Sequence, residues 1–418
     1  MQTFFQPNSG KSQMARYFYD RPGQVFLCYL SRVKKILFFF LIFLCTEGKT
    51  QQTYMLGKTT GPLTFIKYGL GEDRLGGAKM GFLDSNVVVK VVDSVKDDYK
   101  VQVSARHFAW LPKTDFKKDS SVIGRPYYLT NTCKVYGDDK YDYVTVHLDE
   151  RLPYRSMQEI DPSRIIVDIF GATSNTNWII QTSTAKEIKN AWYEQPEDDV
   201  FRVIIELKHR QHWGYLIYYD STSSLVIRVK RQPQQLIPQK LLIAIDAGHG
   251  GSNTGASGVT SGIIEKDYTL KIARQLEQYC RTQKVKTFMT RTHDTDLSMV
   301  DRTLMLRQVD PDILISIHLN DAESDTVRGV STYYRYIGFR PLSQAILKRM
   351  EELKLKEWGN VGAFNFSLNG PTEYPNCLVE VAFLSNRADE KKILDPKFHR
   401  LVAQKIYLGI VDWLKSLK

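Results

Sequence analysis

Four residues in the carboxyl-terminal part of this 418-residue chain have the types that metal-assisted hydrolysis requires: His249, Glu265, His318 and Glu380. Two imidazoles and one carboxylate leave the fourth position of a tetrahedral zinc ion to water, which is the ligand pattern of catalytic rather than structural zinc. A further glutamate that faces such a water is a natural general base. The sequence therefore predicts one zinc ion held by His249, Glu265 and His318, with Glu380 as the catalytic base.

The elements around the three ligands can bring them to one place. His249 follows the apolar segment 241–247, His318 lies near the end of the apolar segment 312–319, and Glu265 opens a helical pattern after a glycine-rich loop. Ligands of open α/β sheets bind beyond the carboxyl ends of the strands. Each residue alone also fits an ordinary structural role, such as a first-turn acid for Glu265. The order of the three candidate ligands along the alternating strands and helices favours a shared site. By contrast, His209 and His212 are expected to be surface imidazoles.

Strands and helices alternate from residue 241 to the end of the chain. The segment 265–280 has helical spacing, and 397–417 is expected to be a closing helix. Glu380 interrupts the apolar strand 377–383, where a charge is costly unless it has a task or a partner. Repeated strand–helix units predict a carboxyl-terminal α/β domain with a mostly parallel sheet flanked by helices.

Two all-β modules are expected upstream of this domain. Short segments rich in β-branched and aromatic residues, such as 87–92 and 200–209, are typical of strands. The proline- and glutamine-rich segment 232–240 is predicted to be a linker. We therefore divide the chain into a leader, a first β module, a second β module, the linker and the α/β domain, which span residues 1–50, 51–130, 142–231, 232–240 and 241–418.

The leader contains a segment, 32–45, in which three basic residues precede ten apolar ones. Ten helical residues span only about 15 Å, half of a bilayer core, which favours a secretory signal over a membrane span. We expect export to the periplasm or cell envelope. Lipidation at Cys45 and a membrane anchor that is never cleaved are alternatives.

Composition narrows the remaining function classes. The net charge is +11, and no nucleic-acid-binding signature accompanies it, so a nucleic-acid partner is not expected. Part of the positive charge lies in the leader. The remaining charge is explained either by binding to polyanionic polymers of the envelope or by a contribution to solubility alone. The five cysteines form no CxxC motif, which argues against a cysteine-ligated zinc and against a disulfide framework, although one disulfide stays open.

Seven segments follow one another in order along the α/β domain: IAIDAGHGG, the helix-opening EKD, MTRTHD, DRTLMLRQ, DILISIHLND, RGVSTYY and CLVEVAFLSN. With these segments the domain resembles the Amidase_3 family of zinc-dependent N-acetylmuramoyl-L-alanine amidases. The stretch 76–116 resembles a bacterial SH3-like module, and the stretch 142–231 resembles the AMIN module, a targeting domain that often precedes envelope amidases.

The Amidase_3 resemblance implies zinc ligands at His249, Glu265 and His318, a catalytic glutamate at Glu380, and a structural arginine at Arg302. It also implies the substrate bond, the amide between the lactyl group of N-acetylmuramic acid and L-alanine in peptidoglycan. The expected role is cell-wall remodelling or daughter-cell separation. The expected partners are peptidoglycan and, through the β modules, cell-division or envelope proteins.

Two other functions stay open at this point. A zinc peptidase that cuts within the stem peptide also uses histidine and glutamate ligands, although HExxH is absent. A non-catalytic wall-binding protein is the second alternative, and the presence of all four site residues argues against it. Some family members carry an inserted helix that blocks the zinc. Only residues 337–340 separate the expected strand 329–336 from the next helix, so we expect no such insertion and no need for that kind of activator.

Overall fold

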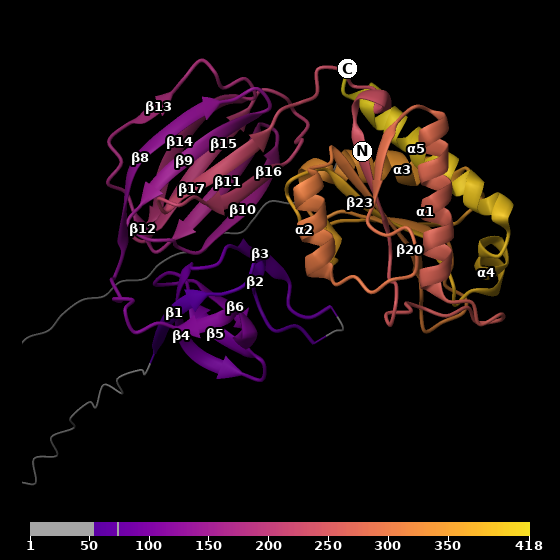
Figure 1. The fold of residues 1–418 in the computed structure, drawn as a ribbon, viewed down its shortest axis with the longest axis horizontal. Coiled ribbons are helices and arrows are strands. Elements are labelled where there is room, and N and C mark those ends of the chain that lie inside the picture. The colour runs from indigo at the N-terminus through magenta and orange to yellow at the C-terminus, as the bar shows by residue number, and fades with distance from the viewer. Residues whose placement is uncertain (1–53, 73–74) are drawn as a thin grey trace, which may run out of the picture. The chain divides into compact units, whose positions relative to one another are not determined.

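The computed structural model describes residues 54–72 and 75–418, and Figure 1 shows its fold with many of the strands and helices labelled. The predicted leader, with its signal-like segment, lies outside the described residues. The described residues belong to one compact unit. Within the described part of the chain, no helix combines the length and the apolar character that crossing a membrane requires.

The first β module is a seven-stranded antiparallel sheet with the order β3-β2-β6-β5-β4-β1-β7. Val89 and Val91 on β4 and Val101 on β5 are almost fully buried, as expected for the inward face of half-buried strands. A short 3-10 helix, η1, precedes the last strand. The bounds are β1 Met55–Thr59, β2 Thr64–Lys67, β3 Lys79–Leu83, β4 Val88–Val95, β5 Asp98–Gln102, β6 Phe108–Pro112, η1 Lys113–Asp115 and β7 Phe116–Lys118.

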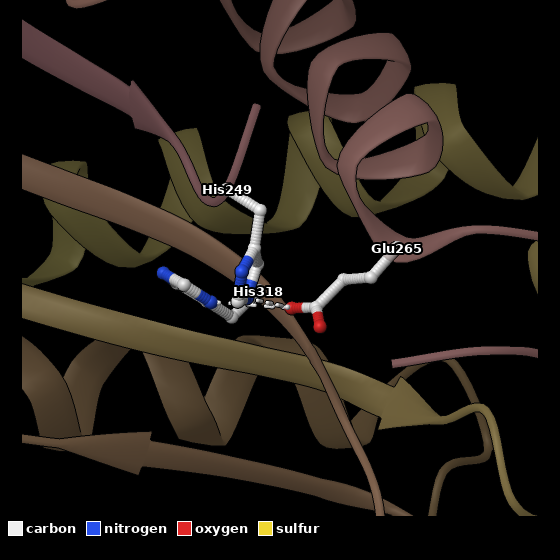
Figure 2. Close-up of side chains that lie close together, drawn as sticks. All are labelled: His249, Glu265 and His318. Carbon is white, nitrogen blue, oxygen red and sulfur yellow. Dashed lines mark hydrogen bonds and ion pairs between the residues drawn. The ribbon is translucent and has the colours of Figure 1, made fainter. Parts of the chain in front are cut away.

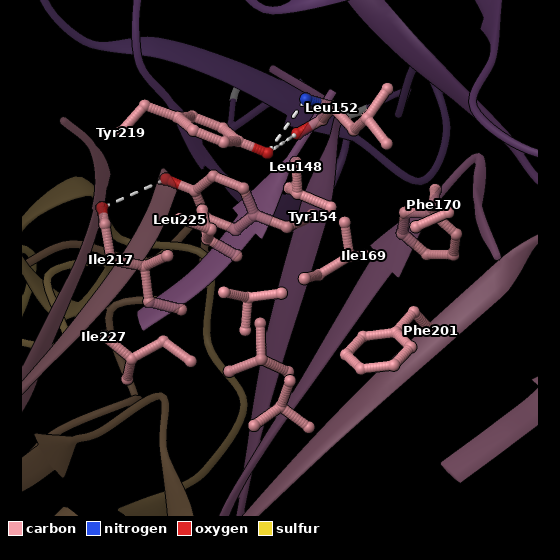
Figure 3. Close-up of a cluster of buried hydrophobic side chains, with 14 of the residues drawn as sticks. Leu148, Leu152, Tyr154, Ile169, Phe170, Phe201, Ile217, Tyr219, Leu225 and Ile227 are labelled. Carbon is pink, nitrogen blue, oxygen red and sulfur yellow. Dashed lines mark hydrogen bonds between the residues drawn. The ribbon is translucent and has the colours of Figure 1, made fainter. Parts of the chain in front are cut away.

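The second β module contains two sheets, with the orders β10-β11-β15-β14 and β12-β8-β9-β17-β16, and β13 pairs with β8. Buried side chains from both sheets fill its core (Figure 3). Tyr154 and Tyr219 keep their hydroxyl groups satisfied inside this core, because they donate to the carbonyls of Ile217 and Leu152. The bounds are β8 Tyr128–Gly137, β9 Tyr141–Leu148, β10 Tyr154–Ile160, β11 Ser163–Phe170, β12 Ala172–Thr173, β13 Ile179–Gln181, β14 Ile188–Glu197, β15 Val200–Leu207, β16 Tyr215–Tyr219 and β17 Ser224–Lys230.

The strand β8 lies where the sequence-based division of the chain left a gap. It pairs with β9 and therefore belongs to the second module, whereas the division ended the first module at residue 130 and began the second at residue 142. The reason is that the residue types of β8, with the sequence YLTNTCKVYG, do not follow its burial: Leu129 and Tyr136 are exposed, whereas Thr130 is buried. Its hydrophobic pattern is too weak to mark a strand without its partner.

The α/β domain is built on a six-stranded sheet with the order β19-β18-β20-β23-β21-β22. The pairs β18–β19, β18–β20, β20–β23 and β21–β22 are parallel, whereas β21–β23 is antiparallel, so the sheet is mixed. The central strands are buried along nearly their whole length, which explains their continuous apolar sequences. The bounds are β18 Leu242–Ala247, β19 Lys286–Met289, β20 Ile313–Asn320, β21 Val330–Tyr333, β22 Glu357–Val361 and β23 Asn376–Phe383.

Five α-helices of the described residues accompany this sheet. The helices α1 and α3 each pack against α5, which carries the buried residues Ile406, Ile410 and Trp413. Only the 3-10 helix η3 lies between β21 and α3, so the described residues contain no inserted helix there. The bounds are α1 Glu265–Thr282, α2 Met299–Val309, α3 Arg340–Glu351, α4 Arg387–Ile393, α5 Pro396–Ser416, η2 Pro238–Lys240, η3 Ile337–Phe339 and η4 Ser367–Asn369.

A tryptophan from the loop between β15 and β16 of the second module completes the core of the α/β domain. Trp213 is buried in that core, and its ring centroid lies 5.1 Å from that of Trp413. Gln211 accepts a hydrogen bond from the Trp413 indole at 3.1 Å and donates to the carbonyl of Gly338 at 2.7 Å. The two domains therefore share a packed and hydrogen-bonded boundary rather than a solvated linker alone.

The described cysteines are all buried, unpaired thiols. Burial raises the pKa of Cys133 to about 11 and that of Cys280 to about 12, so these thiols stay protonated. Cys377 is equally buried in β23. These three residues thus act as small core side chains, and none of them lies among the candidate metal ligands.

Candidate functional site

Three side chains from three different elements converge at one edge of the six-stranded sheet. His249 follows β18, His318 lies near the end of β20, and Glu265 is the first residue of α1 (Figure 2). Glu265 Oε1 lies 3.1 Å from His249 Nε2 and 3.2 Å from His318 Nδ1. One ligand atom from each residue can be chosen so that all lie within 4.8 Å of one another. The sequence-predicted ligand set is therefore brought together.

The turn after β18 places His249 by an unusual backbone conformation. His249 has a φ of 62°, which is uncommon for a residue with a side chain. Gly248 lets this turn pass close to β20, since a Cβ atom at position 248 would lie 2.4 Å from the His318 ring. The Gly-His-Gly sequence thus allows the two imidazoles to approach, with ring centroids 4.9 Å apart.

A buried ion pair stabilises the turn that follows β18 and carries His249. Arg302 of α2 and Asp246 at the end of β18 are both about 1% exposed, and Arg302 Nη1 lies 2.5 Å from Asp246 Oδ1. Arg302 Nη2 donates to the carbonyl of His249 at 2.6 Å. Arg291 adds hydrogen bonds to the carbonyls of Ala247 and Gly248. The sequence suggested only a structural arginine at position 302, and the structure shows that it holds a candidate ligand's backbone.

Further hydrogen bonds orient the ligand side chains. Asn253 Oδ1 lies 2.8 Å from His249 Nδ1, so the neutral imidazole donates there and keeps its Nε2 lone pair for the site. Glu265 accepts from the backbone of Leu319 at 3.0 Å and of Ala256 at 2.8 Å. Asn253 was not predicted from the sequence, although its spacing of four residues from His249 within the glycine-rich loop is a signal.

The electrostatics favour an ionised carboxylate between the imidazoles. Burial would raise the pKa of Glu265, but hydrogen bonds and charge from His249 and His318 hold that pKa far below its ordinary value. Burial would likewise raise the pKa of Asp246, but Arg302 and the Ser316 hydroxyl keep it lowered. Both carboxylates are thus anionic at neutral pH. Glu265 can therefore bind a cation, and Asp246 can pair with Arg302.

Glu380 lies beside the three ligands. It sits on β23 directly opposite His318 on β20, and its side chain is only 6% exposed. Glu380, His249, Glu265 and His318 line one cleft of about 1000 Å³. Glu380 thus shares a cleft with the ligand set, and a carboxylate is a group that can exchange protons with water.

The donor set fits zinc. Imidazole nitrogen and carboxylate oxygen are both zinc ligands, and two histidines with one glutamate leave an open position. The three atoms face one another on the wall of an open cleft, and Asn253 and the backbone of residues 256 and 319 provide the outer hydrogen bonds that orient such ligands. In the described part of the chain, this is the one cluster of histidine, cysteine and acidic side chains with metal-binding spacing.

Three of the other histidines make structural contacts. His212, which was expected at the surface together with His209, is 1% exposed and bonds to the carbonyl of Glu159. Burial lowers the pKa of His212 to about 4, so it is a neutral core residue. His209 pairs with Glu187 at 2.7 Å, and His399 bonds to the carbonyl of Ile393.

The α/β fold, the open cleft and the His-Glu-His cluster form an arrangement that suits the class of metal-dependent hydrolases. Comparison with known families is consistent with that class: residues 243–412 match the family of N-acetylmuramoyl-L-alanine amidases, and residues 134–229 match the AMIN domain. The chain therefore carries an amidase-family domain preceded by an AMIN domain. Neither of these two matches covers the first β module.

Several known proteins are similar to the amidase-family domain. The probable cell wall amidase LytH of Staphylococcus aureus is 33% identical over 174 residues, which are 41% of this chain and 57% of that protein. The chain thus spans little more than half of the length of that relative. The catalytic domain of CwlV, an amidase of Bacillus (Paenibacillus) polymyxa var. colistinus, is 30% identical, with a TM-score of 0.40 and 42% and 98% of the two chains covered. An N-acetylmuramoyl-L-alanine amidase of Clostridium difficile 630 is 31% identical, with a TM-score of 0.41 and coverage of 42% and 97%.

Proposed function

We propose that the chain is a zinc-dependent N-acetylmuramoyl-L-alanine amidase. It hydrolyses the amide between the lactyl group of N-acetylmuramic acid and L-alanine of the peptidoglycan stem peptide. The observation that carries the proposal is the convergence of His249, Glu265 and His318 beside Glu380 in one cleft of the amidase-family domain.

The chemistry assigns a separate task to each residue. Zinc, when bound by His249, Glu265 and His318, supplies a Lewis acid that acidifies water and polarises a carbonyl oxygen. Glu380 takes a proton from the attacking water through its carboxylate and passes it to the nitrogen of the departing alanine. Asn253 keeps His249 in the tautomer whose Nε2 faces the site. Arg302 holds the His249 backbone in place.

We further propose that the enzyme works outside the cytoplasm. Peptidoglycan is the substrate and lies in the cell envelope, and the signal-like segment 32–45 fits export. The AMIN domain and the first β module are proposed to bring the enzyme to its place in the envelope, through peptidoglycan itself or through cell-division and envelope proteins. The cellular role proposed is wall remodelling or daughter-cell separation.

Digestion of purified peptidoglycan tests the activity. The chain from residue 52 onward is the suitable protein, because Trp213 belongs to the core of the α/β domain and a fragment starting at residue 240 would lack it. Mass spectrometry should find free stem peptides that begin with L-alanine. A chelator should abolish this release and added zinc should restore it. Cuts inside the stem peptide would show that the protein is a peptidase and not an amidase. If the protein binds zinc but releases no product, the remaining function would be that of a non-catalytic wall-binding protein.

Glu380→Gln isolates the general base. The amide cannot take up a proton as the carboxylate does, so we expect turnover to fall by roughly 10²- to 10⁴-fold. Zinc content should stay at one ion per chain, because Glu380 is not a proposed ligand. Metal analysis beside the rate measurement checks both. A wild-type rate in the zinc-loaded variant would remove Glu380 from this role.

A further inference from the structure

One wall of the catalytic cleft comes from outside the amidase-family domain. Leu75 and Lys79 of the first β module line the cleft together with His249, Glu265 and His318. Lys79 is the first residue of β3, and Leu75 lies in the segment between β2 and β3. The first module therefore contributes to the surface that a substrate meets.

Hydrogen bonds between side chains of the α/β domain and the backbone of the first module hold this wall of the cleft in place. The side-chain oxygen of Asn365, which also lines the cleft, accepts from the backbone nitrogen of Lys79 at 3.1 Å. Its amide nitrogen donates to the carbonyl of Gly77 at 3.0 Å and to that of Leu75 at 3.3 Å. The Arg335 guanidinium donates to the carbonyl of Lys79. Because these contacts use the backbone of the first module, they do not depend on which side chain stands at position 79.

The charge of Lys79 distinguishes it from the rest of the lining. Among the described residues that line the cleft, it is the one lysine or arginine, whereas Asp321, Glu323 and Glu380 are acids. Neighbouring Lys67 is paired with Asp98 at 2.7 Å, but the described residues offer Lys79 no ion pair. Burial, Arg335 and Lys67 lower the pKa of Lys79 to about 8, so the ammonium form still predominates at neutral pH.

We propose that Lys79 binds a carboxylate of the stem peptide, so that the first β module gives the cleft a preference for carboxylate over carboxamide at the second, D-glutamyl residue of the stem. The inference rests on the proposed amidase function. Among the described residues of the cleft, Lys79 is the one lysine or arginine that attracts a peptide carboxylate, whereas the acids there repel it. A carboxamide has no charge to respond to either. The α-carboxylate of the second residue is the first one after the scissile amide, which makes it the nearest anionic group in sequence.

Binding measurements test this without turnover. Two N-acetylmuramoyl tripeptides that differ only in a carboxylate or a carboxamide at the D-glutamyl residue are titrated into zinc-loaded Glu380→Gln protein by calorimetry. Adding Lys79→Gln should weaken the carboxylate ligand roughly tenfold, as expected for a lost charged hydrogen bond, and change the carboxamide ligand less than about twofold. Lys79→Arg should keep the preference. Lys117→Gln, which removes an exposed charge from the same module, should change neither affinity.

The possible outcomes separate this inference from the proposed function. Equal loss for both ligands would make Lys79 a packing residue, and unchanged or undetectable binding of the carboxylate ligand would also overturn the inference. If the protein without the Glu380 substitution releases no stem peptides while the preference depends on Lys79, the amidase function fails and the carboxylate site stands. If Lys79 determines the preference for the carboxylate over the carboxamide in both binding and turnover, the result supports the carboxylate site and the amidase function together.

Discussion

His249 is the most constrained residue of the site. Its backbone has a positive φ and its carbonyl accepts from Arg302, while its ring lies between Asn253 on one side and Glu265 on the other. An imidazole fixed at both nitrogens loses little freedom when a metal binds, so the protein supplies much of the ordering before binding. The orientation of His249 thus depends on residues that do not touch the metal position.

Asn253→Ala tests this dependence. Removing the acceptor of His249 Nδ1–H leaves the ring free to rotate and to change tautomer, so we expect zinc affinity to fall by about 10-fold or more. Asn253 is exposed, so the fold should be retained. Competition with a chromophoric chelator measures the affinity. Asn253→Asp is the matched control, because a carboxylate oxygen still accepts from Nδ1–H. If the alanine variant binds zinc like the parent, the proposed orienting role is wrong.

At the scale of elements, the site depends on how closely the turn after β18 approaches β20. Glycine at position 248 is needed for this approach, since the Cβ of any other residue would lie 2.4 Å from the His318 ring. The strands β18 and β20 are paired neighbours, so the turn that follows β18 stays close to His318 on β20. The absence of a side chain at position 248 is therefore a requirement of the candidate metal site and not of the sheet alone.

Gly248→Ala should consequently displace His318 and lower zinc affinity by more than about 10-fold, with a smaller effect on folding. The comparison is Gly262→Ala in the loop before α1. Gly262 has a φ of +67°, but a Cβ atom at this position would meet no other atom within 4 Å. That variant should cost about 1 kcal/mol of folding stability and leave zinc binding unchanged. Zinc titration and thermal unfolding of both variants distinguish a clash at the site from backbone strain.

At the scale of the whole molecule, an ion cluster joins the AMIN domain to the amidase-family domain. Asp310, which ends α2 in a left-handed conformation, lies 2.9 Å from the buried Lys230 and 2.6 Å from Lys140, and it accepts from the hydroxyl of Tyr141. Burial would raise the pKa of Asp310, but these three partners lower it to about 2. The cluster therefore stabilises the folded unit only while Asp310 is ionised.

The sign of the resulting pH dependence follows from this lowered pKa. An aspartate with an ordinary pKa of about 3.9 when unfolded and about 2 when folded contributes its full stabilisation above about pH 5, and loses it as the pH falls toward 2. Because Asp310 is partly accessible, we expect about 1–2 kcal/mol. Asp310→Asn should be less stable than the parent by this amount at pH 7, and the difference should shrink at pH 3. Urea unfolding at both pH values measures it. A constant difference would mean that the charge of Asp310 is not what stabilises the boundary.

Much of the molecule could be predicted at the level of elements. The strands β4, β5, β9, β11, β15 and β17 and most of the elements of the α/β domain carry strong apolar patterns, and the structure has them at the expected places. The polar strands β8 and β14, the edge strand β22 and the short helix α4 were not predicted. Their sequences carry little periodicity, and partners distant in the chain stabilise them.

The alternation of strands and helices in the carboxyl-terminal domain could be predicted without coordinates, because hydrophobic period is a local property. The choice of His249, Glu265, His318 and Glu380 rests on residue type and order, which are local as well. The structure brings these side chains to one cleft, and their roles stay predictions. The support of His249 by Asn253 and Arg302, and the position of Lys79 from a separate module in the same cleft, became visible only in the folded chain. Such contacts join residues up to about 290 positions apart, and their geometry follows from how domains pack, which no local pattern encodes.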